Sequence, residues 1–293
     1  MDPSTRPGLF VLLVVLAPAL LAGVVALAGA LVRRGEALGW IGAAAIGPAY
    51  VLGHFFALSA PPRFPPGAAN EALFWSAGLA LFVGVTVGLR KRASAVNALL
   101  VALAACGASW FVLKNLVARL SASELSVLFG GIGVGALVAS LGAERLASAA
   151  RGPTAPFCLW GVAAATAVCM ALSGAATYAS FCAVLAATLG AATVVGWLRR
   201  DLHVGRGLAA VFTVQLAPLV AAGAELNELP HLSALLLLIA PALPGLVGES
   251  RAQSAGAKRA ALMRTALVAL PLLVAVGLCV WERSQRVASP YGY

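Results

Sequence analysis

Residues 8–34 read GLFVLLVVLAPALLAGVVALAGALVRR, an apolar run that closes on the pair Arg33-Arg34. A bilayer core about 30 Å thick needs roughly 20 apolar residues per helix, because a lipid-facing backbone must satisfy its hydrogen bonds within the segment. The run therefore predicts a transmembrane helix. Ala28-Gly29-Ala30 imitates a signal-peptidase site, but the run is longer than an h-region and its basic pair follows it, which favours an uncleaved helix.

The composition extends this prediction to the whole chain. Hydrophobic residues make up 61% and charged residues 10% of the 293 residues, and the mean hydropathy is +0.96. These values lie outside the soluble range. They predict an all-α, polytopic transmembrane helix bundle, with residues 1–293 forming a single integral membrane domain.

Apolar runs closed by charges or Pro/Gly clusters predict about ten spans. The division of the sixth from the seventh depends on Ala176–Phe181, an uncharged turn, and without it the count falls to nine or eight. The expected spans are 8–32, 37–59, 72–89, 94–117, 123–143, 155–177, 180–198, 207–224, 231–248 and 262–281.

The basic residues test this division, because cytoplasmic loops carry an excess of Lys and Arg. With ten spans, one side carries 14 basic and 4 acidic residues, and the other carries 6 of each. The basic side holds Arg33, Arg34, Arg90, Lys91, Arg92, Arg145, Arg151, Arg199, Arg200, Arg206, Arg251, Lys258, Arg259 and Arg264, with Glu36, Glu144, Asp201 and Glu249. The other side holds Arg6, Arg63, Lys114, Arg119, Arg283 and Arg286, with Asp2, Glu71, Glu124, Glu225, Glu228 and Glu282.

This asymmetry predicts an orientation and a location. Both termini are expected outside the cytoplasm, in a multi-pass protein of a bacterial-type cytoplasmic (inner) membrane. The net charge of +10 then reflects topology and attraction to anionic lipids of the inner leaflet. The basic residues are scattered in pairs and triplets without interleaved aromatics, so a nucleic-acid partner is not expected.

Glycines and prolines predict how the helices pack. Gly84 and Gly88, and likewise Gly131 and Gly135, stand four apart on one helix face, where small residues let backbones approach. Pro241 and Pro244 fall in the short ninth span, which predicts a kinked packing helix or an unwound binding segment. Similar phrases at helix ends also hint at parallel repeats of spans 2–5 and 6–9, although common helix-end chemistry explains them as well.

Uncommon polar residues gather at the expected outer side, and Gln215 adds a polar group at depth in the eighth span. We take them as candidate ligand-binding residues, with solvated helix ends as the alternative. The candidates are His54, Lys114, Asn115, Glu124, Gln215, Glu225, Asn227, Glu228 and His231. Imidazole and carboxylate suit transition metals, but Pro230 prevents an ordinary helical pair between Glu228 and His231, so no metal site is predicted.

No cofactor or catalytic motif stands out. Cys106, Cys158, Cys169, Cys182 and Cys279 all fall inside expected helices without CxxC spacing, and they are interpreted as packing residues. No Asp, Glu, Lys or Arg falls at the centre of a span, which weakens proton-coupled pumps and intramembrane acid–base enzymes. We therefore expect no cofactor, and the chain is more readily a non-enzyme than an enzyme.

The phrase Gly142-Ala143-Glu144-Arg145-Leu146 resembles the Gly-Glu-Arg-Leu phrase that often ends repeats in drug/metabolite transporters. The expected orientation is opposite to the usual one in that family, and no binding residue carries over. Three functions stay open: a permease-like protein for a small neutral or amphipathic solute, a non-catalytic membrane subunit or scaffold with a membrane-protein partner, and an outer-face enzyme using His54 or His231. The permease hypothesis expects His54 and Gln215 to line a common cavity.

Overall fold

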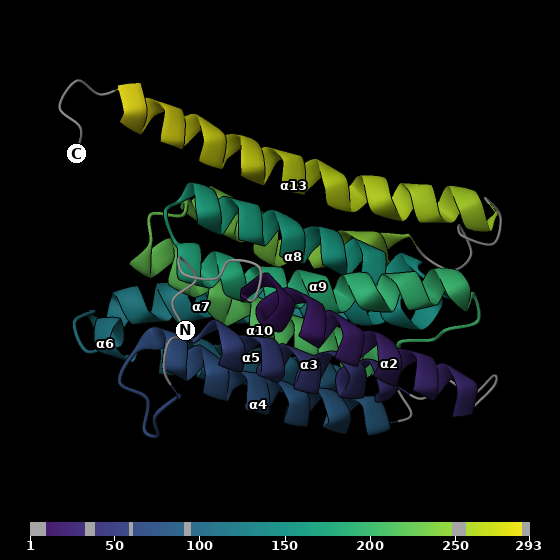
Figure 1. Cartoon of the computed structure of the whole chain (residues 1–293). Helices are drawn as coiled ribbons and strands as arrows, with labels where there is room; N and C mark the ends of the chain where they lie inside the picture. Colours follow the sequence, from purple (N-terminus) through teal and green to yellow (C-terminus); the bar gives the residue numbers. More distant parts are fainter. Residues whose placement is uncertain (1–9, 33–38, 59–60, 91–94, 248–255, 289–293) are drawn as a thin grey trace.

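The computed structural model describes residues 10–32, 39–58, 61–90, 95–247 and 256–288. All regular elements in these ranges are helices, and they form one bundle (Figure 1). In chain order they are η1 (Leu12–Leu16), α2 (Ala17–Val32), α3 (Ile41–Ala57), α4 (Ala69–Leu89), α5 (Ala95–Val112), α6 (Lys114–Val117), α7 (Ala122–Ala149), α8 (Thr154–Leu172), α9 (Ala176–Leu198), α10 (Gly205–Leu226), α11 (His231–Ile239), η2 (Ala240–Leu246) and α13 (Ala257–Ala288).

Each expected span coincides with a helix or with two consecutive helices. In the described part of the chain, eight helices are long and apolar enough to cross a membrane. The remaining two expected spans fall on shorter apolar helices, Ile41–Ala57 and the combined His231–Leu246. The all-helical, multi-pass membrane architecture is therefore confirmed.

Several boundaries differ from the prediction. The sixth and seventh spans separate at residues 173–175 and not at 176–180, because Gly174 adopts a left-handed conformation (φ 80°) that ends the helix, and α9 already begins at Ala176. The fourth span ends at Val112, and Lys114–Val117 forms a separate short helix, α6. Helix α7 also continues past the expected end at 143, through Glu144 and Arg145.

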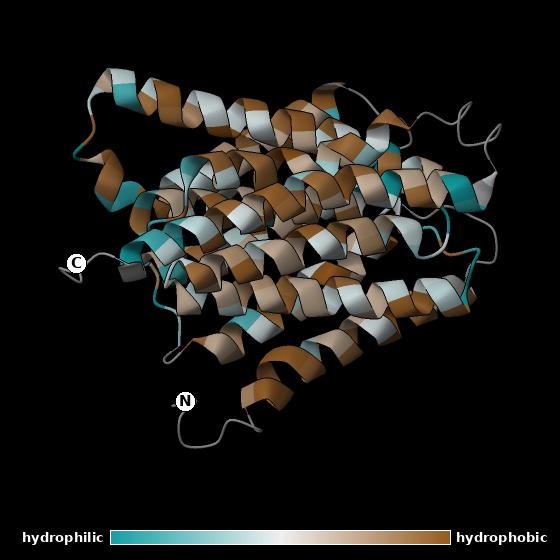
Figure 2. Cartoon of the chain, turned by 90° about the horizontal axis from the view of Figure 1, so that it is seen from above, coloured by the Kyte–Doolittle hydropathy of each residue, from teal (hydrophilic) through white to brown (hydrophobic). Residues whose placement is uncertain are grey.

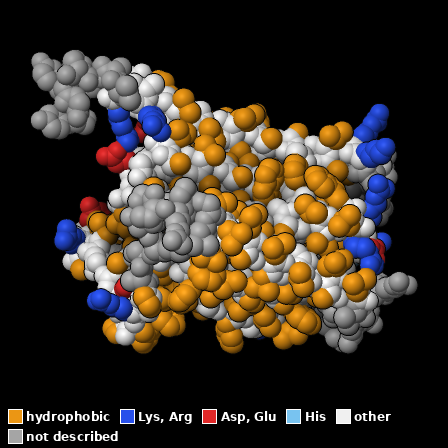
Figure 3. All heavy atoms as spheres, viewed as in Figure 1, with side chains coloured by type: hydrophobic (Ala, Val, Ile, Leu, Met, Phe, Trp, Pro, Cys, Tyr) orange, Lys and Arg blue, Asp and Glu red, His pale blue; other side chains and the backbone are white. Residues whose placement is uncertain are grey.

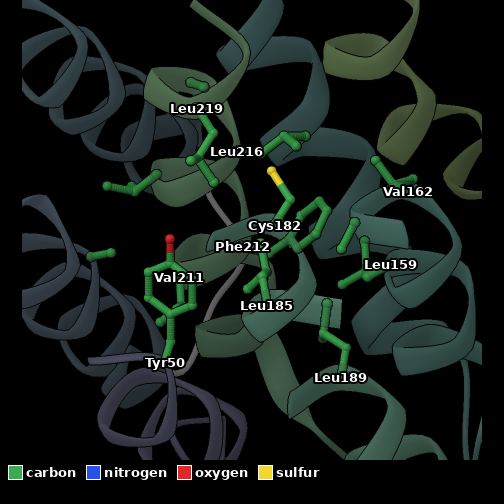
Figure 4. Packing of buried hydrophobic residues seen from close by; sticks show 14 of the residues in the cluster. Tyr50, Leu159, Val162, Cys182, Leu185, Leu189, Val211, Phe212, Leu216 and Leu219 are labelled. Atoms are coloured by element: carbon green, nitrogen blue, oxygen red, sulfur yellow. The ribbon is translucent and has the colours of Figure 1, made fainter. Parts of the chain in front are cut away.

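Helix α10 is the central helix of the bundle. Its residues are buried along almost the whole length, and it packs against α3, α4, α5 and α7. Small residues allow this contact: a Cβ added at Gly84 of α4 would lie 2.3 Å from Val211 Cγ2 of α10. Figure 4 shows Tyr50 of α3 and Cys182 of α9 among the side chains that pack around Val211 and Phe212.

The glycine pair on α4 makes the close approach that the sequence predicts. A Cβ at Gly88 would lie 2.5 Å from Trp40 Cα, so both Gly84 and Gly88 stand in tight helix contacts. The possible repeat does not extend to the packing. Helices α3, α4, α5 and α7 each pack on the next one, whereas α9 has little contact with α10.

Polar residues concentrate at the two ends of the bundle. Hydrophilic residues lie mainly near helix ends and hydrophobic ones along their lengths (Figure 2). On the face shown in Figure 3, Lys and Arg stand almost alone at one end, and acidic groups lie among basic ones at the other. We call the first the basic end, which includes Arg90, Arg145, Arg151, Arg199, Arg200, Arg206, Lys258, Arg259 and Arg264. We call the second the acid-containing end, which includes Glu71, Glu124, Glu225, Glu228 and Glu282.

Some charges used in the sequence argument lie outside the described residues. They are Asp2, Arg6, Arg33, Arg34, Glu36, Lys91, Arg92, Glu249 and Arg251. Residues 59 and 60, and the edges of several expected spans, also lie outside them.

Candidate functional site

A groove of about 620 Å³ opens between α7, α10 and α11 at the acid-containing end. Its size falls in the range of about 300–1,000 Å³ that is usual for small-molecule sites. Val127 of α7 and Leu235 of α11, on facing walls, are 78% and 50% exposed, so the groove also opens sideways along the apolar surface of the bundle. The lining residues are Leu120, Ser123, Glu124, Val127, Leu128, Gly131, Ile132, Ala217, Val220, Ala221, Ala224, Glu225, His231, Ala234, Leu235 and Leu238.

Glycines on one face of α7 show where this helix stands apart from its neighbours and where it touches them. Gly131 lines the groove, and a Cβ added there would meet nothing within 4 Å. One turn further, a Cβ at Gly135 would lie 2.4 Å from Leu238 Cδ2. At Gly142 it would lie 2.2 Å from Ala242 Cα. Helix α7 therefore diverges from α11 at the acid-containing end and touches the backbone of η2 toward the basic end.

The predicted packing role of the glycine pair Gly131 and Gly135 is thus confirmed only in part. Gly135 stands in a helix contact, whereas Gly131 faces open space. Both glycines lie on the same face of α7. They differ because α11 lies close to Gly135 and away from Gly131.

The proline-containing ninth span is interrupted as the sequence predicts. Helix α11 ends at Ile239 and continues as the 3₁₀ segment η2, which contains Pro241 and Pro244. Proline lacks the amide hydrogen that an α-helix interior needs, and its ring clashes with the preceding turn. The change of helix type brings Ala242 and Gly245 against Gly142, because each of these residues has little or no side chain.

Polar groups line the groove only at its rim. Glu124 caps the start of α7, where its Oε2 accepts hydrogen bonds from the backbone N–H of Ser121 (2.8 Å) and from the Ser121 hydroxyl (2.7 Å). Glu225 lies near the end of α10, and its Oε1 is 3.4 Å from Nε2 of His231. Glu225 and His231 lie on the two sides of the turn between α10 and α11. The rim of the groove therefore carries the carboxylates of Glu124 and Glu225 and the imidazole of His231.

Of the nine candidate residues, only Glu124, Glu225 and His231 line this groove. Glu228 instead pairs with Arg286 of α13. The Asn227 side chain donates to the carbonyl of Ala222 (3.3 Å).

Two more candidates lie on α6. Lys114 donates from Nζ to the carbonyl of Pro66. Asn115, beside it, is exposed. The structure therefore does not bring Lys114 and Asn115 into the groove.

His54 and Gln215 lie in the packed interior, and neither lines the groove. The His54 ring stacks on Phe181 of α9 with a centroid distance of 3.7 Å, and its Nε2 lies 3.3 Å from the carbonyl oxygen of Asn70. Gln215 is fully buried on α10, and its amide atoms have no hydrogen-bond partner among the described residues. The groove that the structure contains is thus built from other residues than the cavity expected around His54 and Gln215.

The apolar walls of the groove were missed by sequence reasoning. The positions that α10 contributes, Ala217, Val220, Ala221 and Ala224, repeat at three and four residues and so share one helix face. That spacing is visible in the sequence, but almost every face of α10 is equally apolar. Only the packing shows which face borders the groove.

A polar network with two buried members, Asn97 and Glu144, lies at the basic end. Arg90 donates to Asn97 Oδ1 (3.1 Å), the Asn97 side chain hydrogen-bonds Glu144, and Glu144 pairs with Arg206. These residues come from the end of α4 and from α5, α7 and α10, so the network ties the central helix α10 to three of its neighbours. Glu144 and Asn97 are 5% and 0% exposed.

The described part of the chain contains no group of three or more His, Cys, Asp or Glu side chains placed to hold a metal ion. All five cysteines are free, and four of them are buried.

Comparisons with protein-family models, curated proteins and solved structures find no match for this chain.

Proposed function

We propose that this chain is a ten-span protein of a bacterial inner membrane that binds an amphipathic solute in the groove between α7, α10 and α11 and moves it as a permease. The observation that carries the proposal is the unequal closure of one helix interface. The groove is open at Gly131 and shut at Gly142. A site open to one side of the membrane and closed to the other is the arrangement that alternating access requires.

Helix lengths support ten spans. Helix α3 has 17 residues, the lower limit of the range for a membrane helix. Segments α11 and η2 have 9 and 7 residues. With rises of about 1.5 Å per α-helical residue and 2.0 Å per 3₁₀ residue, they extend about 28 Å together. That length is close to the hydrocarbon thickness of about 30 Å.

The charges support the orientation. The basic end holds nine described Lys and Arg residues against Glu144 and Asp201, and positive residues favour the cytoplasmic side. We infer that this end meets anionic lipids of the inner leaflet, and that both termini and the groove mouth lie on the extracytoplasmic side.

Two neighbouring glycines test the groove. Gly131 lines it and Gly130 does not, yet a Cβ at either position would meet no atom within 4 Å. Gly131→Leu should therefore fill the groove, and Gly130→Leu should leave it open, with similar effects on the helix. We would measure binding of a dansyl-labelled undecyl alcohol to each variant in nanodiscs. Equal binding by both variants would overturn the proposal.

A second candidate is a non-catalytic membrane subunit. It expects an exposed groove of small residues, and a second hollow between α5 and α7 is lined by Cys106, Gly107, Trp110, Leu125, Ser126 and Phe129. Gly107→Leu would fill this hollow, since a Cβ there meets nothing within 4 Å. Loss of a co-purifying membrane protein in this variant, with unchanged probe binding, would favour the subunit function.

A further inference from the structure

We propose that the occupant of the groove is an amphiphile with one hydrocarbon chain and a cationic headgroup, and that Glu124 and Glu225 receive the headgroup. This inference rests on the proposed function, because it names the class of solute that the groove takes. Charge, depth and shape of the groove each contribute to the argument.

The charge of the rim selects the headgroup. The described lining contains the carboxylates of Glu124 and Glu225 and contains no Lys or Arg. The nearby guanidinium of Arg286 is engaged by Glu228 and Glu282 on the α13 side of the turn. A cation placed in the mouth is therefore attracted by two carboxylates, whereas an anion would meet both of them with only the His231 imidazole, beside Glu225, to offset their charge.

The two carboxylates stand on different walls. Glu124 belongs to α7, where its hydrogen bonds to Ser121 fix its position at the helix start. Glu225 belongs to α10, and its side chain is 23% exposed beside His231. A cationic headgroup in the mouth is therefore attracted from both walls, whereas a neutral headgroup gains nothing from the two charges.

Below the rim the lining is apolar. From Glu225 to Ala217 the groove descends eight residues of α10, about 12 Å at 1.5 Å per residue. Leu128 and Ile132 form one wall and Leu235 and Leu238 the other. Such walls suit a hydrocarbon chain, and the sideways opening between Val127 and Leu235 gives that chain a path from the lipid.

The test compares three probes that share a dansyl-labelled undecyl chain and differ only in the head: trimethylammonium, hydroxyl or sulfonate. Binding is measured by dansyl fluorescence with the full chain in zwitterionic nanodiscs, and each signal is corrected with empty discs. We expect the ammonium probe to bind about tenfold more tightly than the sulfonate probe. Glu124→Gln and Glu225→Gln should each weaken ammonium binding several-fold and leave alcohol binding unchanged.

The chain offers a matched control. Glu71 lies in the first turn of α4, as Glu124 does in α7, and it accepts a backbone hydrogen bond from Gly67 (2.7 Å). It is at the same end of the bundle but outside the groove lining. Glu71→Gln should not change the head preference. Glutamine also serves in a capping box, so Glu124→Gln removes the charge and retains the cap.

The outcomes separate the two proposals. If Gly131→Leu removes binding of all three probes but the wild-type protein binds them equally, the groove is a site and its cation preference is refuted. If Gly131→Leu and Gly130→Leu bind every probe equally, the proposed function fails as well. A head preference that Glu71→Gln removes as effectively as Glu225→Gln would also overturn the assignment of the carboxylates.

Discussion

Arg206 Nε lies 3.3 Å from Glu144 Oε1 and joins the first turn of α10 to α7 at the basic end of the bundle. The contact is an ion pair without an aligned hydrogen bond at that oxygen. The side chains of Arg206 and Glu144 are only 21% and 7% exposed. In such surroundings an ion that loses its partner has little water to replace it.

Arg206→Ala should therefore lower the free energy of unfolding by about 3 kcal/mol, because it leaves Glu144 charged and nearly buried. Glu144→Gln in the Arg206→Ala background should restore part of that loss, since the amide can keep the bond to Asn97. Arg200→Ala, at an exposed basic residue of the same end, should change stability by less than about 0.5 kcal/mol. Unfolding in mild detergent measures all three variants, and equal losses for Arg206→Ala and Arg200→Ala would contradict the role of the ion pair.

Gly142 and Gly131 should respond oppositely to a side chain. Gly142→Ala would place a Cβ 2.2 Å from Ala242 Cα and 2.4 Å from its carbonyl oxygen, so the backbones of α7 and η2 must separate, at a cost of about 1–3 kcal/mol. Gly131→Ala meets nothing and should leave the melting temperature unchanged or slightly raised. The check is the melting temperature of both variants. A tolerated Gly142→Ala would show that the closed contact is absent in the membrane.

Several of these features could be predicted from sequence and others could not. The all-helical, multi-pass architecture follows from local hydropathy, and the break of the ninth span follows from Pro241 and Pro244. Helix partners depend on distant residues. From the sequence, His54 is a candidate ligand-binding residue near the expected outer side. In the structure the ring of Phe181, which is far along the chain, stacks on the His54 ring and covers it.

The groove was unpredictable for the same reason. Gly131 and Gly135 lie four residues apart on one face of an apolar helix, and only the position of α11 makes one a contact and the other an opening. The rim was partly predictable, because Glu124, Glu225 and His231 are rare polar groups at helix ends. The same criterion also makes Lys114 a candidate, but its side chain binds the carbonyl of Pro66 and does not line the groove.

Gln215→Leu should stabilise the protein. Both amide atoms of Gln215 are buried without a hydrogen-bond partner among the described residues, and an unsatisfied polar group costs about 1–3 kcal/mol. Leucine has a similar volume and no such cost. Thermal unfolding gives the result, with the conservative Leu216→Met on the same buried helix as a packing control. A clear loss of stability in Gln215→Leu would show that a buried water or solute satisfies the amide.

The stability of the basic end should depend on pH through His203, which lies between α9 and α10. Burial, and secondarily Arg151, lower the pKa of His203 below its usual value of 6.5. His203 therefore binds a proton at a higher pH in the unfolded chain than in the folded one. The contribution of neutral His203 to the free energy of unfolding is complete above pH 6.5 and is lost as the pH falls below that value. The melting temperature should fall between about pH 7 and 5 more in wild type than in His203→Gln. Parallel curves for the two proteins would refute this assignment.

Cysteine labelling should distinguish ten spans from eight. In a cysteine-free background, single cysteines at Ala118, after α6, and Ser173, after α8, should react with a membrane-impermeant maleimide on intact cells, because both lie at the acid-containing end. A cysteine at Arg200, between α9 and α10, should react only after permeabilisation. If α3 did not cross the membrane, the chain after it would invert, and Ala118 and Ser173 would be protected while Arg200 reacted. A fourth single cysteine, at Arg283 of α13, tests the α11–η2 segment. If only this segment did not cross, the cysteines at 118, 173 and 200 would keep their pattern. The cysteine at 283 would then be labelled only after permeabilisation instead of on intact cells.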